Sequence, residues 1–101
     1  PHQLAYASAK GGVEQMTKVM ALEWAKLGVR VNAIGPTYFE TDMVKQIRND
    51  PVRFNFINER TPMGRWGYPP ELEGTVIFLA APASDFITGQ TIYIDGGWTI
   101  W

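Results

Sequence analysis

The 101-residue sequence contains no cysteine and a single histidine, His2. The absence of cysteine excludes a disulfide framework and a thiolate metal site, and one terminal histidine offers little basis for an imidazole site. No apolar run approaches the roughly 18 residues of a membrane span, and no basic segment followed by an apolar run suggests a signal peptide. We therefore expect a cytoplasmic protein without a bound metal.

Strong charge of one sign is also missing. Nine basic and ten acidic residues give a formal net charge of -1, and the basic residues are scattered along the chain. Nucleic acids and anionic membranes are bound by concentrated basic surfaces, so the sequence predicts neither as a partner. Apolar residues, in contrast, are plentiful. A hydrophobic content of 46% with 13% aromatic residues argues against disorder and favours one folded domain at most.

The first third of the chain predicts a helix followed by a strand. Apolar residues recur every three or four positions from Tyr6 to Leu27, which is typical of a helix, and Gly28 is a suitable C-cap. The β-branched, alternating run over 29–34 predicts a short strand that ends at Gly35 and Pro36.

The rest of the chain predicts a loop, a second helix and a second strand. Residues 37–68 are interpreted as a loop with short helices near 41–49 and 51–60. Residues 69–81 predict a helix that is apolar almost all round and should be buried, and residues 90–94 predict a strand. The order favours an α/β fold with parallel strands, but two strands cannot complete a parallel sheet, which is normally covered on both faces. We expect the sheet to be completed from outside these residues.

The segment YASAK places Tyr6 and Lys10 one helical turn apart. Residues four apart lie on one helix face, so the ammonium group can lower the pKa of the phenol from about 10 toward neutrality. Such a tyrosine suits acid or base catalysis on an alcohol or ketone. The alternative is a helix-end tyrosine beside a solvated lysine.

Further motifs follow in order: VRVNAIGPTYFETDM, TPMGRWG and ITGQTIYIDGG. With YASAK, they resemble the C-terminal part of classical short-chain dehydrogenase/reductases, and the resemblance covers essentially the whole chain. Gluconate 5-dehydrogenase-like and 3-oxoacyl reductase-like members are the most similar. The resemblance implies the C-terminal part of a Rossmann-like, doubly wound fold. Residues 1–101 would be a single partial domain with a mobile substrate loop at about 42–68.

The resemblance also implies roles for individual residues. Tyr6 would be the catalytic acid/base, and Lys10 would bind the nicotinamide ribose of NAD or NADP and lower the tyrosine pKa. The main chain of Phe39 and the hydroxyl of Thr41 would contact the nicotinamide carboxamide. The cofactor-binding residues implied are Lys10, Pro36, Thr37, Phe39 and Thr41.

Two features depart from the family pattern. Thr37 replaces the glycine that follows the proline in the family, and a β-branched residue would tolerate a positive φ poorly there. No glycine-rich dinucleotide motif occurs in the sequence, and the serine and asparagine of the family's active site are absent as well. We therefore expect the chain alone to be inactive, with doubtful cofactor binding, and to need an N-terminal half.

Several other residues have simpler interpretations. Arg65 could bind an acidic substrate, but a solvated loop arginine is favoured. Asp42 and Asp50 are interpreted as helix caps, and the Asp95-Gly96-Gly97 sequence as a turn. The four tryptophans are interpreted as packing or interface groups; they are Trp24, Trp66, Trp98 and Trp101.

Two functional hypotheses result. In the first, the chain is the catalytic-end segment of an NAD(P)-dependent oxidoreductase that interconverts a secondary alcohol and a ketone. In the second, it is a non-catalytic, self-associating module of the same family. Two copies would then join at residues 90–94 to form a homo-oligomer, either a dimer or a tetramer.

Overall fold

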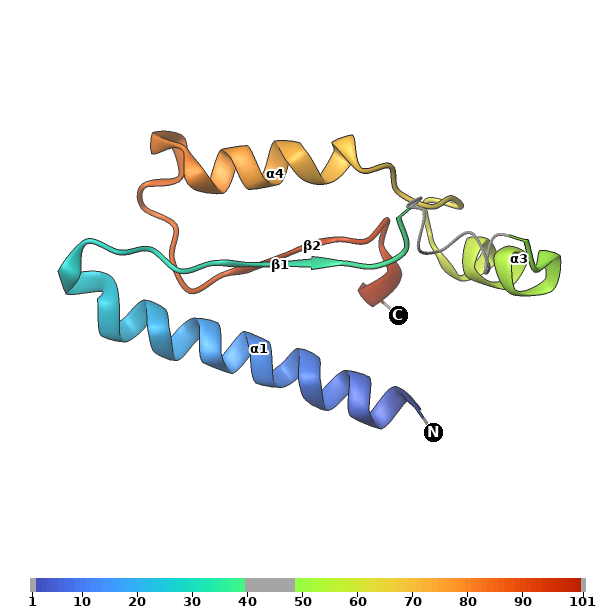
Figure 1. Ribbon diagram of the computed structural model, residues 1–101, viewed down its shortest axis with the longest axis horizontal. Coiled ribbons are helices and arrows are strands. Elements are labelled where there is room, and N and C mark those ends of the chain that lie inside the picture. The colour runs from blue at the N-terminus through green and yellow to red at the C-terminus, as the bar shows by residue number, and fades with distance from the viewer. Residues whose placement is uncertain (1, 40–48, 101) are drawn as a thin grey trace. The chain divides into compact units, whose positions relative to one another are not determined.

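The computed structural model describes residues 2–39 and 49–100 (Figure 1). In chain order the elements are α1 (His2–Trp24), η1 (Ala25–Leu27), β1 (Ala33–Pro36), α3 (Pro51–Arg60), α4 (Pro70–Ala80), η3 (Pro82–Ser84), β2 (Thr91–Ile94) and η4 (Trp98–Ile100). None of the described helices combines the length and the apolar character needed to cross a bilayer.

Helix α1 is one long helix that ends in the 3-10 turn η1. Gly28 follows this turn with a φ of 77°, and its N–H donates to the Ala25 carbonyl at 3.0 Å. The left-handed backbone is accessible to glycine without the steric cost that a Cβ brings. The predicted first helix and its glycine C-cap are thus confirmed.

Strands β1 and β2 lie side by side and run parallel (Figure 1). Just before the ladder, the Gly89 N–H donates to the Val31 carbonyl at 2.7 Å. The Ala33 N–H then donates to the Gln90 carbonyl at 2.8 Å. Because both residue numbers rise together across these bonds, the register is that of parallel strands. The predicted α/β class with an incomplete parallel sheet is confirmed.

The first strand begins later than the sequence predicts. Residues 29–32 were expected in it, but β1 starts at Ala33. Side chains take up the polar groups just before that point: the Val31 N–H donates to Thr88 Oγ1 at 3.1 Å, and the Asn32 amide donates to the Ile87 carbonyl at 3.0 Å. The Val31 N–H is thus bonded to a side chain and not to a strand carbonyl, which delays the start of the regular ladder.

Helix α3 matches the helix predicted near 51–60. Asp50 is its N-cap: its Oδ1 accepts hydrogen bonds from the N–H groups of Val52 and Arg53 at 3.2 and 3.3 Å. Pro51 occupies the first turn, where its missing N–H costs nothing. The other predicted short helix and Asp42 fall almost entirely on 40–48, outside the described residues.

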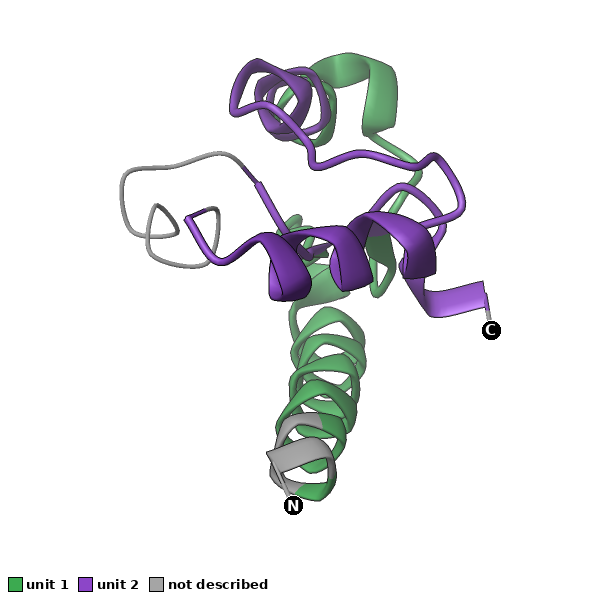
Figure 2. Ribbon diagram, turned by 90° about the vertical axis from the view of Figure 1, so that its right-hand side faces the viewer, with its two compact units in different colours: residues 1–34, 78–92 green, residues 35–77, 93–101 purple. Residues whose placement is uncertain are grey.

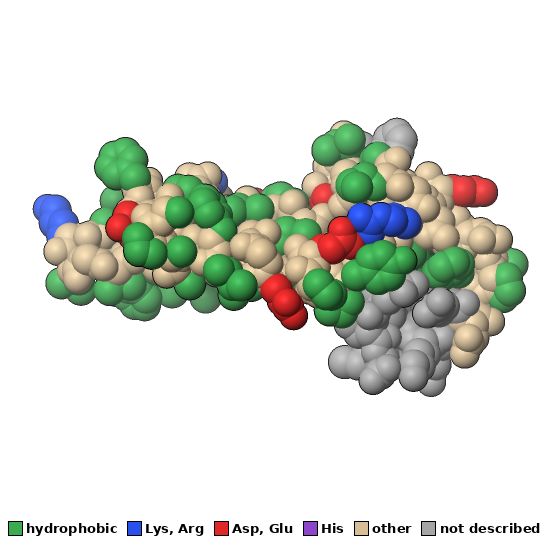
Figure 3. Space-filling view, turned by 90° about the horizontal axis from the view of Figure 1, so that it is seen from above, with side chains coloured by type: hydrophobic (Ala, Val, Ile, Leu, Met, Phe, Trp, Pro, Cys, Tyr) green, Lys and Arg blue, Asp and Glu red, His purple; other side chains and the backbone are tan. Residues whose placement is uncertain are grey.

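Helix α4 forms where predicted, but the expectation that it is buried is wrong. No residue of α4 is buried, and Ile77 is 66% exposed. The space-filling view from the side of α4 shows hydrophobic side chains along this face, with few charged ones among them (Figure 3). An apolar composition predicts that a helix needs a cover, and the described residues of this chain do not provide it.

The chain divides into two compact units (Figure 2). Unit 1 comprises Pro1–Ile34 and Phe78–Ile92, and unit 2 comprises Gly35–Ile77 and Tyr93–Trp101. Among the described residues, unit 1 buries Thr17, Ala21 and Ser84, and unit 2 buries Phe39, Ile57, Thr61 and Trp66.

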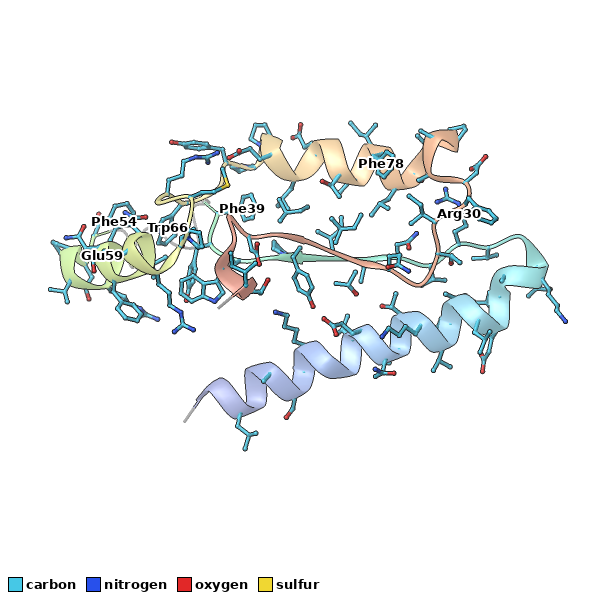
Figure 4. All side chains as sticks on the ribbon, turned by 180° about the vertical axis from the view of Figure 1, so that it is seen from behind. Arg30, Phe39, Phe54, Glu59, Trp66 and Phe78 are labelled. Atoms are coloured by element: carbon cyan, nitrogen blue, oxygen red, sulfur yellow. The ribbon has the colours of Figure 1, made fainter. Side chains whose placement is uncertain are left out.

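A polar network holds unit 1 around Ser84, which is fully buried. Arg30 Nη1 donates to the Ser84 carbonyl at 2.8 Å and to its Oγ at 2.9 Å. The Ser84 hydroxyl in turn donates to the Leu79 carbonyl at 3.0 Å. Arg30, labelled in Figure 4, therefore joins the approach to β1 to the turn at η3.

Candidate functional site

Unit 2 contains a cavity of about 340 Å³. Its walls come from three segments: residues 37–39, which follow β1; parts of 61–71; and residues 93–97, at the end of β2. In open α/β sheets ligands bind beyond the carboxyl ends of the strands, which is where this cavity lies. Its volume is within the usual range for small-molecule sites.

The segment after β1 supplies two of the predicted cofactor-binding residues to the cavity wall, Thr37 and Phe39. Thr37 does not have the positive φ that the glycine of the family could have required, so the β-branched residue fits without backbone strain. Phe39 is buried at 7% exposure. Pro36 ends β1 directly before them, and Thr41 lies outside the described residues.

The turn after β2 forms another wall. Asp95 Oδ1 accepts from the Gly97 N–H at 3.0 Å, and Oδ2 accepts from the Thr99 hydroxyl at 2.7 Å. The carbonyl of Gly96 accepts from the Met63 N–H at 3.0 Å, which ties the turn to the segment before Arg65. The turn interpretation is confirmed, but its place in the cavity wall was not foreseen from the sequence.

Arg65 and Glu71 form a bidentate ion pair in the wall that comes from residues 61–71. Arg65 Nη1 and Nη2 donate to Glu71 Oε1 and Oε2, both at 2.7 Å. The hydrogen bonds from Arg65 and then from the Tyr68 backbone N–H lower the pKa of Glu71 to about 2. Arg65 lies in a loop and is exposed, as the sequence predicts, but its guanidinium is held by a carboxylate that the sequence did not indicate.

An aromatic cluster lies beside the cavity. The Tyr38 ring centroid is 5.3 Å from those of Trp66 and Trp98, and Phe54 is 5.5 Å from Trp66. Figure 4 shows Phe54 and Trp66 together near α3. Since Trp66 is only 3% exposed, its interpretation as a packing residue is confirmed. Trp101 lies outside the described residues.

Tyr6 and Lys10 both lie on α1 in unit 1, one helical turn apart. The side chain of Tyr6 is outside the described structure, and that of Lys10 is half-buried. In the part of the chain that is described, no group of three or more His, Asp or Glu side chains could hold a metal ion.

Comparison with known proteins identifies the family. Residues 1–99 match the family described as enoyl-(acyl carrier protein) reductase. The chain belongs to the short-chain dehydrogenase/reductase family, as its motifs suggested.

Three relatives illustrate the similarity. A 2-dehydro-3-deoxy-D-gluconate 5-dehydrogenase from Formosa agariphila is 52% identical over 92% of this chain. The crystal structure of a gluconate 5-dehydrogenase from Burkholderia cenocepacia in complex with NADP and tartrate covers 95% of this chain, with 45% identity and a TM-score of 0.87. A 4-hydroxyisoleucine dehydrogenase complexed with NADH covers 97%, with 31% identity and a TM-score of 0.90.

The match spans only part of these relatives: 36% of the Formosa enzyme, 38% of the Burkholderia chain and 40% of the 4-hydroxyisoleucine dehydrogenase. Two of them bind NADP or NADH, so the predicted cofactor class is confirmed for the family.

Proposed function

We propose that these residues form the catalytic-end segment of an NAD(P)-dependent oxidoreductase that interconverts a secondary alcohol and a ketone. The observation that supports this most directly is the match over residues 1–99, within which Tyr6 and Lys10 stand one turn apart on α1. The glycine-rich turn that seats the dinucleotide would come from chain outside these 101 residues.

In this proposal the phenolic oxygen of Tyr6 gives a proton to the substrate oxygen during reduction and takes one during oxidation. Lys10 lowers the pKa of that phenol, because a nearby cation favours the phenolate. Bound nicotinamide would accept or supply the hydride. The main chain of Phe39 and the hydroxyl of Thr41, with Pro36 and Thr37 beside them, would hold its carboxamide.

For the substrate we propose a sugar acid or its keto derivative. The support is the names of the relatives, several of which are dehydrogenases of gluconate or 2-dehydro-3-deoxy-D-gluconate. A galactitol 2-dehydrogenase from Cereibacter sphaeroides is 44% identical, so a neutral polyol is the matched alternative in a substrate screen.

The test is turnover by the full-length protein that carries these residues, with NAD and NADP, on gluconate and galactitol. Tyr6→Phe should lower kcat by about 10²- to 10⁴-fold and leave the far-UV circular dichroism spectrum unchanged. Lys10→Met should also lower kcat, whereas Lys26→Met, in the exposed turn η1, should not. Full activity in Tyr6→Phe would remove the tyrosine from this role.

The isolated 101 residues should bind NADPH weakly, because most contacts to a dinucleotide would lie elsewhere. Titration followed by cofactor fluorescence measures this directly. Saturable binding at micromolar concentration would contradict the division of the cofactor site that we propose.

Self-association is a second candidate function, favoured by the apolar surface of the chain. Leu4, Met16 and Leu22 on α1 are all exposed, as are Val76 and Ile77 on α4. Surfaces of this kind are typical of interfaces. We propose a homo-oligomer, which analytical ultracentrifugation on dilution would test. A compact, folded monomer at low micromolar concentration would contradict it.

A further inference from the structure

The carboxylate of Glu71 binds both ends of the segment 65–68. Besides the two bonds from Arg65, Glu71 Oε1 accepts from the Tyr68 N–H at 2.8 Å. Arg65 Nη1 also donates to the Trp66 carbonyl at 2.9 Å. These hydrogen bonds fix the backbone of Trp66 and of Tyr68. Gly67 lies between these two residues and is therefore held from both sides.

Gly67 meets the segment that follows β1. Its N–H donates to the Tyr38 carbonyl at 2.9 Å, and Gly67 forms an isolated parallel bridge with Phe39. A Cβ at residue 67 would lie 2.7 Å from Cδ1 and 2.8 Å from Cζ of the Phe39 ring. Gly67 has no positive φ, so a larger residue is excluded by the ring and not by the backbone angle.

The position of Phe39 therefore depends on Gly67, and that of Gly67 on the ion pair. Phe39 is buried and has its main chain bridged to Gly67 on one side, so a displaced Gly67 must displace Phe39. We infer that Gly67, Arg65 and Glu71 are positioning residues that set the main chain of Phe39 for cofactor binding. This inference rests on the proposed function, in which that main chain contacts the nicotinamide carboxamide.

The test uses steady-state kinetics of the full-length protein with NADP. Gly67→Ala should raise the KM for NADP about tenfold or more while kcat at saturating NADP changes little, because binding geometry is lost and the acid/base group is not. Gly74→Ala is the matched control, since a Cβ there meets nothing within 4 Å and its φ is not positive. Its KM for NADP should equal that of the wild type.

A second substitution separates positioning from direct contact with the ligand. Phe39→Leu makes room for the new Cβ. In the double variant Gly67→Ala with Phe39→Leu, the KM for NADP should therefore return most of the way to the wild-type value. A glycine that acted by touching the ligand itself would show no such rescue, and the inference would be wrong.

Glu71→Gln keeps the test decisive should Gly67→Ala fail to fold. The amide retains one acceptor for the Tyr68 N–H but loses the charge that holds Arg65, so a several-fold rise in KM for NADP is expected, with kcat preserved. If the enzyme is active and the KM for NADP is unchanged in both Gly67→Ala and Glu71→Gln, this inference is wrong and the proposed function still stands. A wild-type protein that neither binds nor uses NAD(P) overturns the proposed function as well.

Discussion

Unit 2 buries large apolar side chains of its own, whereas the buried residues of unit 1 are small or polar. In the described part of unit 2, Phe39, Ile57 and Trp66 are buried. In that of unit 1, Ala21 is the only buried hydrophobic residue, and Thr17 and Ser84 are the buried polar ones. Since burial of a large apolar side chain contributes about 1.5–3 kcal/mol, the two units draw on different sources of stability.

This difference in buried side chains indicates that unit 2 can hold its cavity in shape with its own residues. The cavity in unit 2 is built from a core, an aromatic cluster and a bidentate ion pair that all belong to that unit. Unit 1 has a network around Arg30 and Ser84, but most of the described large apolar side chains of α1 are exposed. Three substitutions test this difference between the two units.

Removal of the Trp66 ring should have the largest effect on stability. Trp66→Ala deletes a nearly fully buried indole that contacts Tyr38 and Phe54, and a cost of about 3–5 kcal/mol in the free energy of unfolding is expected. Urea denaturation followed by far-UV circular dichroism measures it. Trp24→Ala, at a residue that is 41% exposed in unit 1, is the matched control and should cost much less. Equal losses would contradict the contrast between the units.

A smaller effect is expected in the polar core of unit 1. Ser84→Ala removes the hydroxyl that accepts from Arg30 and donates to the Leu79 carbonyl, which should cost about 1–3 kcal/mol. Ser8→Ala, at an exposed position of α1, is the control and should be nearly neutral. Hydrogen exchange at the amides of residues 84–89 would localise the loss. Unchanged protection there would show that the network does not stabilise unit 1.

The ion pair of unit 2 should give the smallest effect, and one that depends on pH. The pKa of Glu71 is lowered from 4.5 to about 2, so its contribution is complete above the unfolded value and disappears as the pH falls through the folded one. The difference in Tm between wild type and Glu71→Gln should be constant well above pH 4.5, shrink as the pH falls and vanish below about pH 2. Glu73→Gln, in the same turn of α4, controls for the lost charge. A pH-independent difference would contradict the pairing.

Local sequence signals were sufficient for most of the fold. The periodicity of α1, the Gly28 cap and the Asp50 cap of α3 are properties of neighbouring residues, and each was predicted. The start of β1 was wrong because Thr88, far along the chain, binds the backbone of Val31. The burial of α4 was wrong because its composition does not specify what covers it.

The site was less predictable, because its contacts join residues from separate segments of the chain. Thr37 and Phe39 came from the family resemblance, and the structure places both in the cavity wall. The pairing of Arg65 with Glu71 crosses a turn, so helical spacing gave no sign of it. Gly67 is a glycine because of the ring of Phe39, a contact that only the folded chain creates. A glutamate in the first turn of a helix, shortly after an arginine-containing turn, is the signal that could have indicated the pair.

The ion pair also bears on how the chain is cut by proteases. A trypsin-like enzyme must draw the arginine or lysine of its target into a specificity pocket that holds a carboxylate. At Arg65 the guanidinium is already held by two carboxylate oxygens, and the residue after the scissile bond, Trp66, is buried. Lys26 is exposed in η1, two residues before Gly28, which caps this turn. Digestion of the folded chain should therefore open the end of α1 well before the bond that joins Arg65 to Trp66.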